Sequence, residues 1–203
     1  MGDLALFVLV GAAALVAARW FRGGVLGGLR QTAVRGWPFA VAGLALQALV
    51  GALPAAGPFG VLLLVAALVT LLAVVRANGR LPGAPLLALG LLANLLVVLL
   101  NVGMPVPAAT LERAGMAAER PIPHRPDAEH VLAGPSTRLG VLGDRLAVRP
   151  LRTVTSFGTV AELAGLFLLV QHLMVAAAPT RRRDGSAHGA HEARTVPWST
   201  WAE

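Results

Sequence analysis

Five long apolar runs occupy a large part of this 203-residue chain. They cover residues 4–20, 37–53, 59–75, 84–102 and 157–178. A soluble core of this size cannot bury so many apolar runs, whereas a bilayer core about 30 Å thick needs roughly 17–25 such residues per helix. The low share of charged residues, 13 %, agrees with a membrane environment. The sequence therefore predicts an all-α, polytopic membrane protein with a bundle of five transmembrane helices.

The predicted transmembrane domain covers residues 1–178 and includes one long extracytoplasmic loop, residues 103–156. Within this loop we expect a brief helix around residues 108–118. Residues 139–148 are apolar but too short to span a bilayer, which predicts an interfacial or re-entrant segment. The polar tail, residues 179–203, is predicted to be disordered and cytoplasmic.

The arginine distribution predicts the orientation. Basic residues gather in alternate connections between the runs, with Arg19, Arg22, Arg30 and Arg35 in the first and Arg76 and Arg80 in the third. Because cytoplasmic connections carry the excess of Arg, we expect the N-terminus outside and the C-terminus inside. Arg145, Arg149 and Arg152, beside the last run, favour the opposite orientation. The strongly asymmetric flanks of the first run decide between the two.

Several classes of function find no support in the sequence. The chain has no Cys, so it offers neither a disulfide framework nor a thiolate metal site. Its net charge of +7 comes without aromatics interleaved among the arginines, so we predict no nucleic-acid partner. His124 and His130 lie near Asp127 and Glu129, but at a spacing that matches no metal-ligand signature. We therefore predict no catalytic residue, cofactor or metal site from motifs.

Polar residues within the apolar runs are few. Gln47 lies on a small-residue face of the second run, and Asn94 lies in the fourth, seven residues before Asn101. Amides on such faces hydrogen-bond across helix contacts, so Gln47 and Asn94 are predicted to be helix-packing groups. Glu162 is flanked by Gly158 and Gly165, so we expect it to face the bundle.

The role of Glu162 has two interpretations. It is either a structural carboxylate, protonated or paired with Arg149 or Arg152, or a group that handles protons or substrate. The broader candidate cluster at the outer face consists of Asn101, His130, Asp144, Arg145 and Glu162. We expect Met104–Pro105 to turn the chain out of the fourth helix. Asp144 would then either cap a short interfacial helix or act as a functional carboxylate.

Short motifs follow one another along the chain in a defined order. The first half holds Arg22–Gly23–Gly24, Leu29–Arg30, Arg35–Gly36–Trp37, Gln47, Arg80–Leu81–Pro82–Gly83 and Asn94. The second half holds Asn101–Val102–Gly103–Met104–Pro105–Val106, His130, Thr137–Arg138–Leu139, Leu142–Gly143–Asp144, Ser156 and Gly158. Over residues 4–175 this series resembles a bacterial membrane family known as domain of unknown function 5317. The resemblance implies a multi-pass plasma-membrane protein and implies no particular activity.

The chain departs from the pattern of that family at one position. The resemblance implies an acid after Gly158, where this chain has Thr159. Glu162 follows one helical turn later and is the candidate replacement.

Three functions are compatible with these patterns. The favoured one is a non-enzymatic scaffold or accessory protein whose partners are the lipid bilayer and other membrane proteins or a second copy of the chain. A small transporter or channel component would need a wet cavity lined by Gln47, Asn94, Asn101 and Glu162. A membrane-embedded enzyme acting on a lipid-linked substrate at the outer face would need Asp144, Arg145, His130 and Glu162 to converge beside Asn101.

Overall fold

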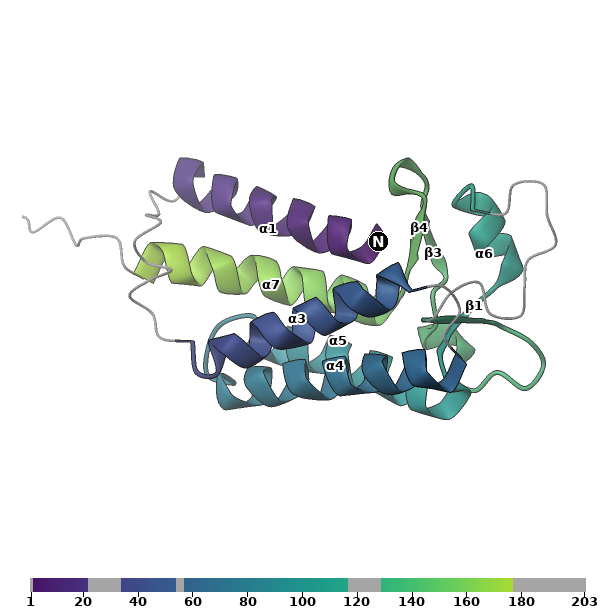
Figure 1. Cartoon of the computed structure of the whole chain (residues 1–203). Helices are drawn as coiled ribbons and strands as arrows, with labels where there is room; N and C mark the ends of the chain where they lie inside the picture. The colour runs from purple at the N-terminus through teal and green to yellow at the C-terminus, as the bar shows by residue number, and fades with distance from the viewer. Residues whose placement is uncertain (1, 22–33, 54–56, 117–128, 177–203) are drawn as a thin grey trace, which may run out of the picture.

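A bundle of long helices forms most of the computed structural model, which describes residues 2–21, 34–53, 57–116 and 129–176 (Figure 1). The helices are α1 (Gly2–Phe21), α3 (Trp37–Ala52), α4 (Gly57–Ala77), α5 (Ala84–Asn101) and α7 (Phe157–Ala176). Each begins and ends within two residues of a predicted apolar run. The mainly helical class predicted from the sequence is therefore confirmed. The predicted tail and His124 lie outside the described residues.

Three of these helices are long and apolar enough to cross a membrane, in Pro58–Ala77, Ala84–Asn101 and Phe157–Val175. The apolar stretches of α1 and α3, Ala5–Phe21 and Trp37–Ala52, are shorter. Five spans therefore stay a prediction.

Helix contacts run in the order α3, α4, α5, α7 and α1, and successive helices along the chain point in opposite directions (Figure 1). Between α3 and α4, Gly43 allows the close approach, because a Cβ there would lie 2.8 Å from the side chain of Leu71. At the far side of α7, Gln171 donates from Nε2 to the carbonyl of Ala14 on α1, at 2.7 Å. Small residues and amides therefore join the helices, as the sequence predicts for such faces.

The outer faces of the helices are apolar. Large side chains such as Leu62 on α4, Leu89 on α5 and Leu168 on α7 are exposed. Buried positions on the same helices include polar residues, among them Asn94, Glu162 and Gln171. A helix that is apolar on its exposed face and carries its polar groups inside suits a lipid surrounding.

A small mixed subdomain caps one end of the bundle (Figure 1). Strand β1 (Met104–Val106) pairs in parallel with β2 (His130–Leu132), and β3 (Leu146–Val148) pairs antiparallel with β4 (Thr153–Thr155). Helix α6 (Ala108–Arg113) packs on β3 and β4, and η1 (Gly140–Leu142) and η2 (Arg149–Leu151) are single 3₁₀ turns. Val106, Leu111, Ala114 and Val154 form the core of this cap. The all-α prediction lacked these strands.

One predicted detail of the loop, the turn at Met104–Pro105, is wrong. The chain leaves α5 through Val102 and Gly103, whose φ angles are 56° and 141°, and Pro105 already lies in β1. Residues 139–148, predicted to be an interfacial or re-entrant segment, form η1 and β3 within the cap. There, a Cβ on Gly143 would lie 2.9 Å from Cγ of Pro105, so this glycine is needed for close packing.

Candidate functional site

Four glycines bring α5 and α7 into close contact: Gly83 and Gly90 on the α5 side, and Gly158 and Gly165 on α7. A Cβ on Gly90 would lie 2.6 Å from Cγ of Glu162, and one on Gly165 would lie 2.7 Å from the carbonyl oxygen of Gly83. Such approaches are possible only without side chains. The contact places polar side chains of α7 directly against α5.

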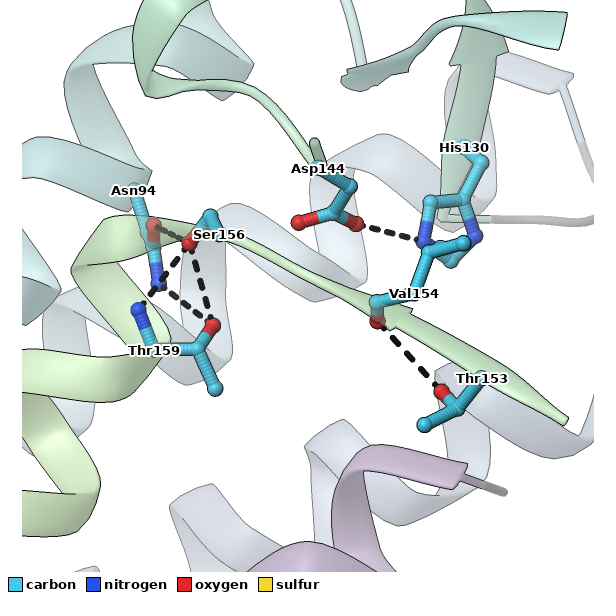
Figure 2. Close-up of polar contacts among 7 residues, drawn as sticks. All are labelled: Asn94, His130, Asp144, Thr153, Val154, Ser156 and Thr159. Carbon is cyan, nitrogen blue, oxygen red and sulfur yellow. Dashed lines mark hydrogen bonds and ion pairs between the residues drawn. The ribbon is translucent and has the colours of Figure 1, made fainter. Parts of the chain in front are cut away.

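Asn94 of α5 is the centre of a buried hydrogen-bond network. Its Nδ2 donates to Oε1 of Glu162 at 2.8 Å and approaches Oγ1 of Thr159 at 3.3 Å. Its Oδ1 accepts from Oγ of Ser156 at 2.8 Å, and Ser156 Oγ lies 3.1 Å from Thr159 Oγ1 (Figure 2). The Ser156 hydroxyl also caps α7 by accepting from the backbone N–H of Thr159 at 2.9 Å. Asn94 therefore fixes the start of α7 against α5.

Glu162 faces protein, as its glycine-flanked face predicts, with only 3 % of its surface exposed. It and Thr159 contact the same amide nitrogen of Asn94. A carboxylate one turn later therefore reaches the group that an acid at position 159 would reach. This geometry suits Glu162 as a replacement for the acid that the resemblance implies after Gly158, and the replacement stays a prediction.

A second polar pair lies in the cap. Nε2 of His130, on β2, lies 2.8 Å from Oδ2 of Asp144, which is 2 % exposed (Figure 2). The backbone N–H of Asp144 donates to the carbonyl of Pro105 at 2.9 Å, which fixes the carboxylate beside β1. Asp144 therefore pairs with a histidine and does not cap the short helix η1.

Two members of the predicted cluster lie apart from this pair. Asn101 donates from Nδ2 to the carbonyls of Val97 and Arg138, at 2.8 and 2.9 Å, and accepts from the N–H of Arg138 at 2.8 Å. Arg145 donates from Nε to the carbonyl of Gly140 at 2.7 Å. Asn101 anchors the loop to the end of α5, and Arg145 braces η1.

The Asn94 network and Asp144 line one small cavity at the junction of the helices and the cap. Besides Asn94, Thr159, Glu162 and Asp144, its walls include Gln47, Glu129, Phe7, Leu64, Leu68, Val98 and Met104. The volume of this cavity, taken as the space that the centre of a water molecule can occupy, is about 20 Å³. A cavity needs roughly 10–15 Å³, measured in this way, to accommodate one water molecule. The cavity is thus polar and has room for one or two waters.

Three acidic residues, Glu129, Asp144 and Glu162, line this cavity. Such groups could accept hydrogen bonds from water or exchange protons with it. Within the described residues no three His, Asp or Glu side chains gather closely enough to hold a metal ion.

Sequence reasoning missed two polar groups. Asn78, after α4, accepts from the N–H of Arg35 at 2.9 Å and donates to its carbonyl at 2.8 Å. The second is the pair of His130 and Asp144: both belong to the predicted cluster at the outer face, but the sequence did not indicate their direct contact, because the two lie 14 residues apart without periodicity. The sequence signal for Asn78 was its place just before Arg80–Leu81–Pro82–Gly83, a motif without an assigned role.

The fold and its sites define a class: a helical bundle with lengths and surfaces suited to a membrane, closed at one end by a small α/β cap. The model of a family of unknown function, DUF5317, matches residues 31–171, and the chain belongs to this family. The motifs at residues 22–24 and 29–30 lie outside the matched range. Searches of curated proteins and of solved structures give no match.

Proposed function

We propose that this chain is an integral protein of the bacterial plasma membrane that crosses the bilayer five times, with residues 103–156 outside and the polar tail inside. Support comes from the apolar outer faces of the helices and from the positions of the arginines. Arg19, Arg35, Arg76 and Arg80 all lie at the end of the bundle opposite the cap. Cytoplasmic connections are enriched in such residues. The cap end also carries arginines, at positions 113, 138, 145, 149 and 152, so the strongly asymmetric flanks of the first run carry the proposed orientation.

We further propose that the protein acts as a non-enzymatic scaffold or accessory protein, for other membrane proteins or for a second copy of itself. The observation that carries this proposal is the size of the cavity at the outer end. Sites for small molecules have volumes of about 300–1,000 Å³, whereas the volume of this cavity is about 20 Å³. The polar groups around it bind one another, which suits a rigid outer cap.

The test is complementation of a deletion strain that has a measurable phenotype. Asp144→Asn and Glu162→Gln keep hydrogen-bonding oxygens while they remove the charges. A scaffold should therefore function with either variant at a normal protein level. Glu112→Gln, at an exposed position of α6, is the matched control. Loss of function in Asp144→Asn or Glu162→Gln, with a normal protein level and a functional control, would overturn the scaffold proposal.

A transporter or channel component is the second candidate. It is favoured by one observation, that Gln47, Asn94 and Glu162 line the same polar cavity. This candidate predicts that Glu162→Gln abolishes function without lowering stability. A membrane-embedded enzyme has less support, because Asn101 and Arg145 bond to backbone carbonyls away from His130 and Asp144.

A further inference from the structure

The end of the bundle opposite the cap holds a much larger hollow. Residues 76–81, after and at the end of α4, line it together with Arg35, which precedes α3. Its volume is about 580 Å³ and it is open to the outside. Arg35–Gly36–Trp37 and Arg80–Leu81–Pro82–Gly83, the motifs for which the outer end provides no role, meet here.

Asn78 builds this hollow. Its side chain forms a two-way hydrogen-bond pair with the backbone of Arg35 and also donates to the carbonyl of Val74 at 2.8 Å. The following turn is closed by the N–H of Leu81, which donates to the carbonyl of Asn78 at 2.9 Å. These bonds fix the backbone. Arg35, Arg76 and Arg80 therefore keep their places around the hollow without bonds from their own side chains.

The three arginines face the hollow without a nearby acid from their own segments. Arg35, Arg76 and Arg80 are exposed, and residues 4–111 contain no Asp or Glu. Glu162 lies at the opposite end of α7. The guanidinium group presents a fork of donors that matches phosphate oxygens and stays charged at any physiological pH. The chemistry of the hollow therefore suits a phosphate group.

Aromatic side chains lie at the same level of the bundle. Trp37 and Phe39, in the first turn of α3, are 63 % and 65 % exposed, and Trp20 lies in the last turn of α1 at the same end. Exposed tryptophans mark the depth of lipid headgroups in membrane proteins. Basic pockets between helices at the cytoplasmic side bind anionic headgroups.

We propose that the hollow lined by Arg35, Arg76 and Arg80 binds a phosphate group, and that the phosphate belongs to an anionic phospholipid of the inner leaflet. The phosphate chemistry rests on the hollow itself. Only the lipid source rests on the proposed membrane orientation, so the two parts fail separately.

The test uses the full chain in a neutral detergent at low ionic strength, with isothermal titration calorimetry. Three ligands are compared: dihexanoyl phosphatidylglycerol, dihexanoyl phosphatidylcholine and inorganic phosphate. We expect the phosphatidylglycerol to bind at least tenfold more tightly than the phosphatidylcholine, and inorganic phosphate to compete with it. Added salt should weaken the binding.

The combined substitutions Arg35→Gln, Arg76→Gln and Arg80→Gln should lower the affinity for phosphatidylglycerol at least tenfold. The control combines Arg113→Gln, Arg138→Gln and Arg149→Gln, which remove the same charge at the cap end. At about 0.15 M salt it should retain the affinity within about twofold, since charges at that distance are then screened. If the triple variant does not fold, Arg80→Gln alone should still weaken binding severalfold.

Equal affinity of the triple variant and the unmodified chain would overturn the proposal, as would no binding at all. Equal affinity for the two lipids, which both carry a phosphate, would overturn the anionic lipid as its source. Binding of inorganic phosphate without binding of phosphatidylglycerol would overturn the lipid source and assign the hollow to a soluble phosphate.

Discussion

Two asparagines at opposite ends of the bundle make the same set of hydrogen bonds. Asn78 follows α4 and Asn101 ends α5, and each donates to the carbonyl four residues earlier at 2.8 Å. Each also forms a two-way pair with the backbone of an arginine, Arg35 for Asn78 and Arg138 for Asn101. The side-chain amide makes the hydrogen bonds that a backbone peptide group would make. It thereby joins a separate segment of the chain to a helix end.

The surroundings of the two asparagines differ. Beyond Asn101, the cap buries Asp144 against His130, and Glu162 is satisfied by Asn94 beneath it. Around Asn78, arginines stay exposed at an open hollow. One structural device therefore serves two ends: a capped end that buries the carboxylates of Asp144 and Glu162, and an open end whose segments contain no carboxylate. We infer that binding specificity belongs to the open end.

The largest expected effect comes from disrupting the glycine contact between α5 and α7. Gly90→Leu should lower the free energy of unfolding by more than about 3 kcal/mol, because overpacking typically costs 1–3 kcal/mol and here backbone atoms of α7 block the side chain. Thermal unfolding in detergent measures the loss. Gly11→Leu is the matched control, since no atom lies within 4 Å of a Cβ at that position of α1. Equal losses in both variants would contradict the close packing of α5 on α7.

Removing the carboxylate of Glu162 should have a smaller effect. Glu162→Leu removes the shorter of the two hydrogen bonds that Nδ2 of Asn94 donates, which should cost about 1–3 kcal/mol of unfolding free energy. Glu162→Gln keeps an oxygen that accepts from Asn94, so its stability should stay close to that of the unmodified chain. Chemical denaturation in detergent distinguishes the two. A gain in stability for Glu162→Leu would mean that the carboxylate is strained or faces lipid.

Substitution of the two asparagines should have the smallest effect on stability. It also gives the finest test of the difference between the two ends. Asn78→Ala and Asn101→Ala should each cost about 1 kcal/mol, since each removes partly exposed hydrogen bonds of modest net value. Only Asn78→Ala should also weaken phosphatidylglycerol binding, because it releases Arg35. Calorimetry on both variants tests this difference. A similar loss of binding in Asn101→Ala would show that the two ends are not independent.

The sequence predicted the long helices well, because apolar runs of membrane-spanning length reveal their own boundaries. It also predicted the inward faces of Asn94 and Glu162, since single polar residues among small ones mark a helix contact. The sequence did not predict the fold of the cap. Strands of three residues, such as β1 and β3, are too short for an alternating pattern to emerge.

Partners separated along the chain were the other failure. Arginines were expected beside the carboxylates, but Arg145 and Arg152 bond to the carbonyls of Gly140 and Gly115, and Asp144 pairs with His130. Sequence spacing does not reveal such pairs, because the packing of the cap determines which groups meet. The hollow at the open end was missed for the same reason.

The central claim is that the closed end lies outside the cell and the open, arginine-lined end lies inside. The chain has no cysteine, so a single cysteine can be placed at each end. Ser136→Cys lies in the cap and Ala77→Cys lines the hollow, and both positions are exposed. With an impermeant thiol reagent on intact cells, the account predicts labelling of the Ser136→Cys variant, and of the Ala77→Cys variant only after permeabilisation. Labelling of the Ala77→Cys variant alone in intact cells would contradict it.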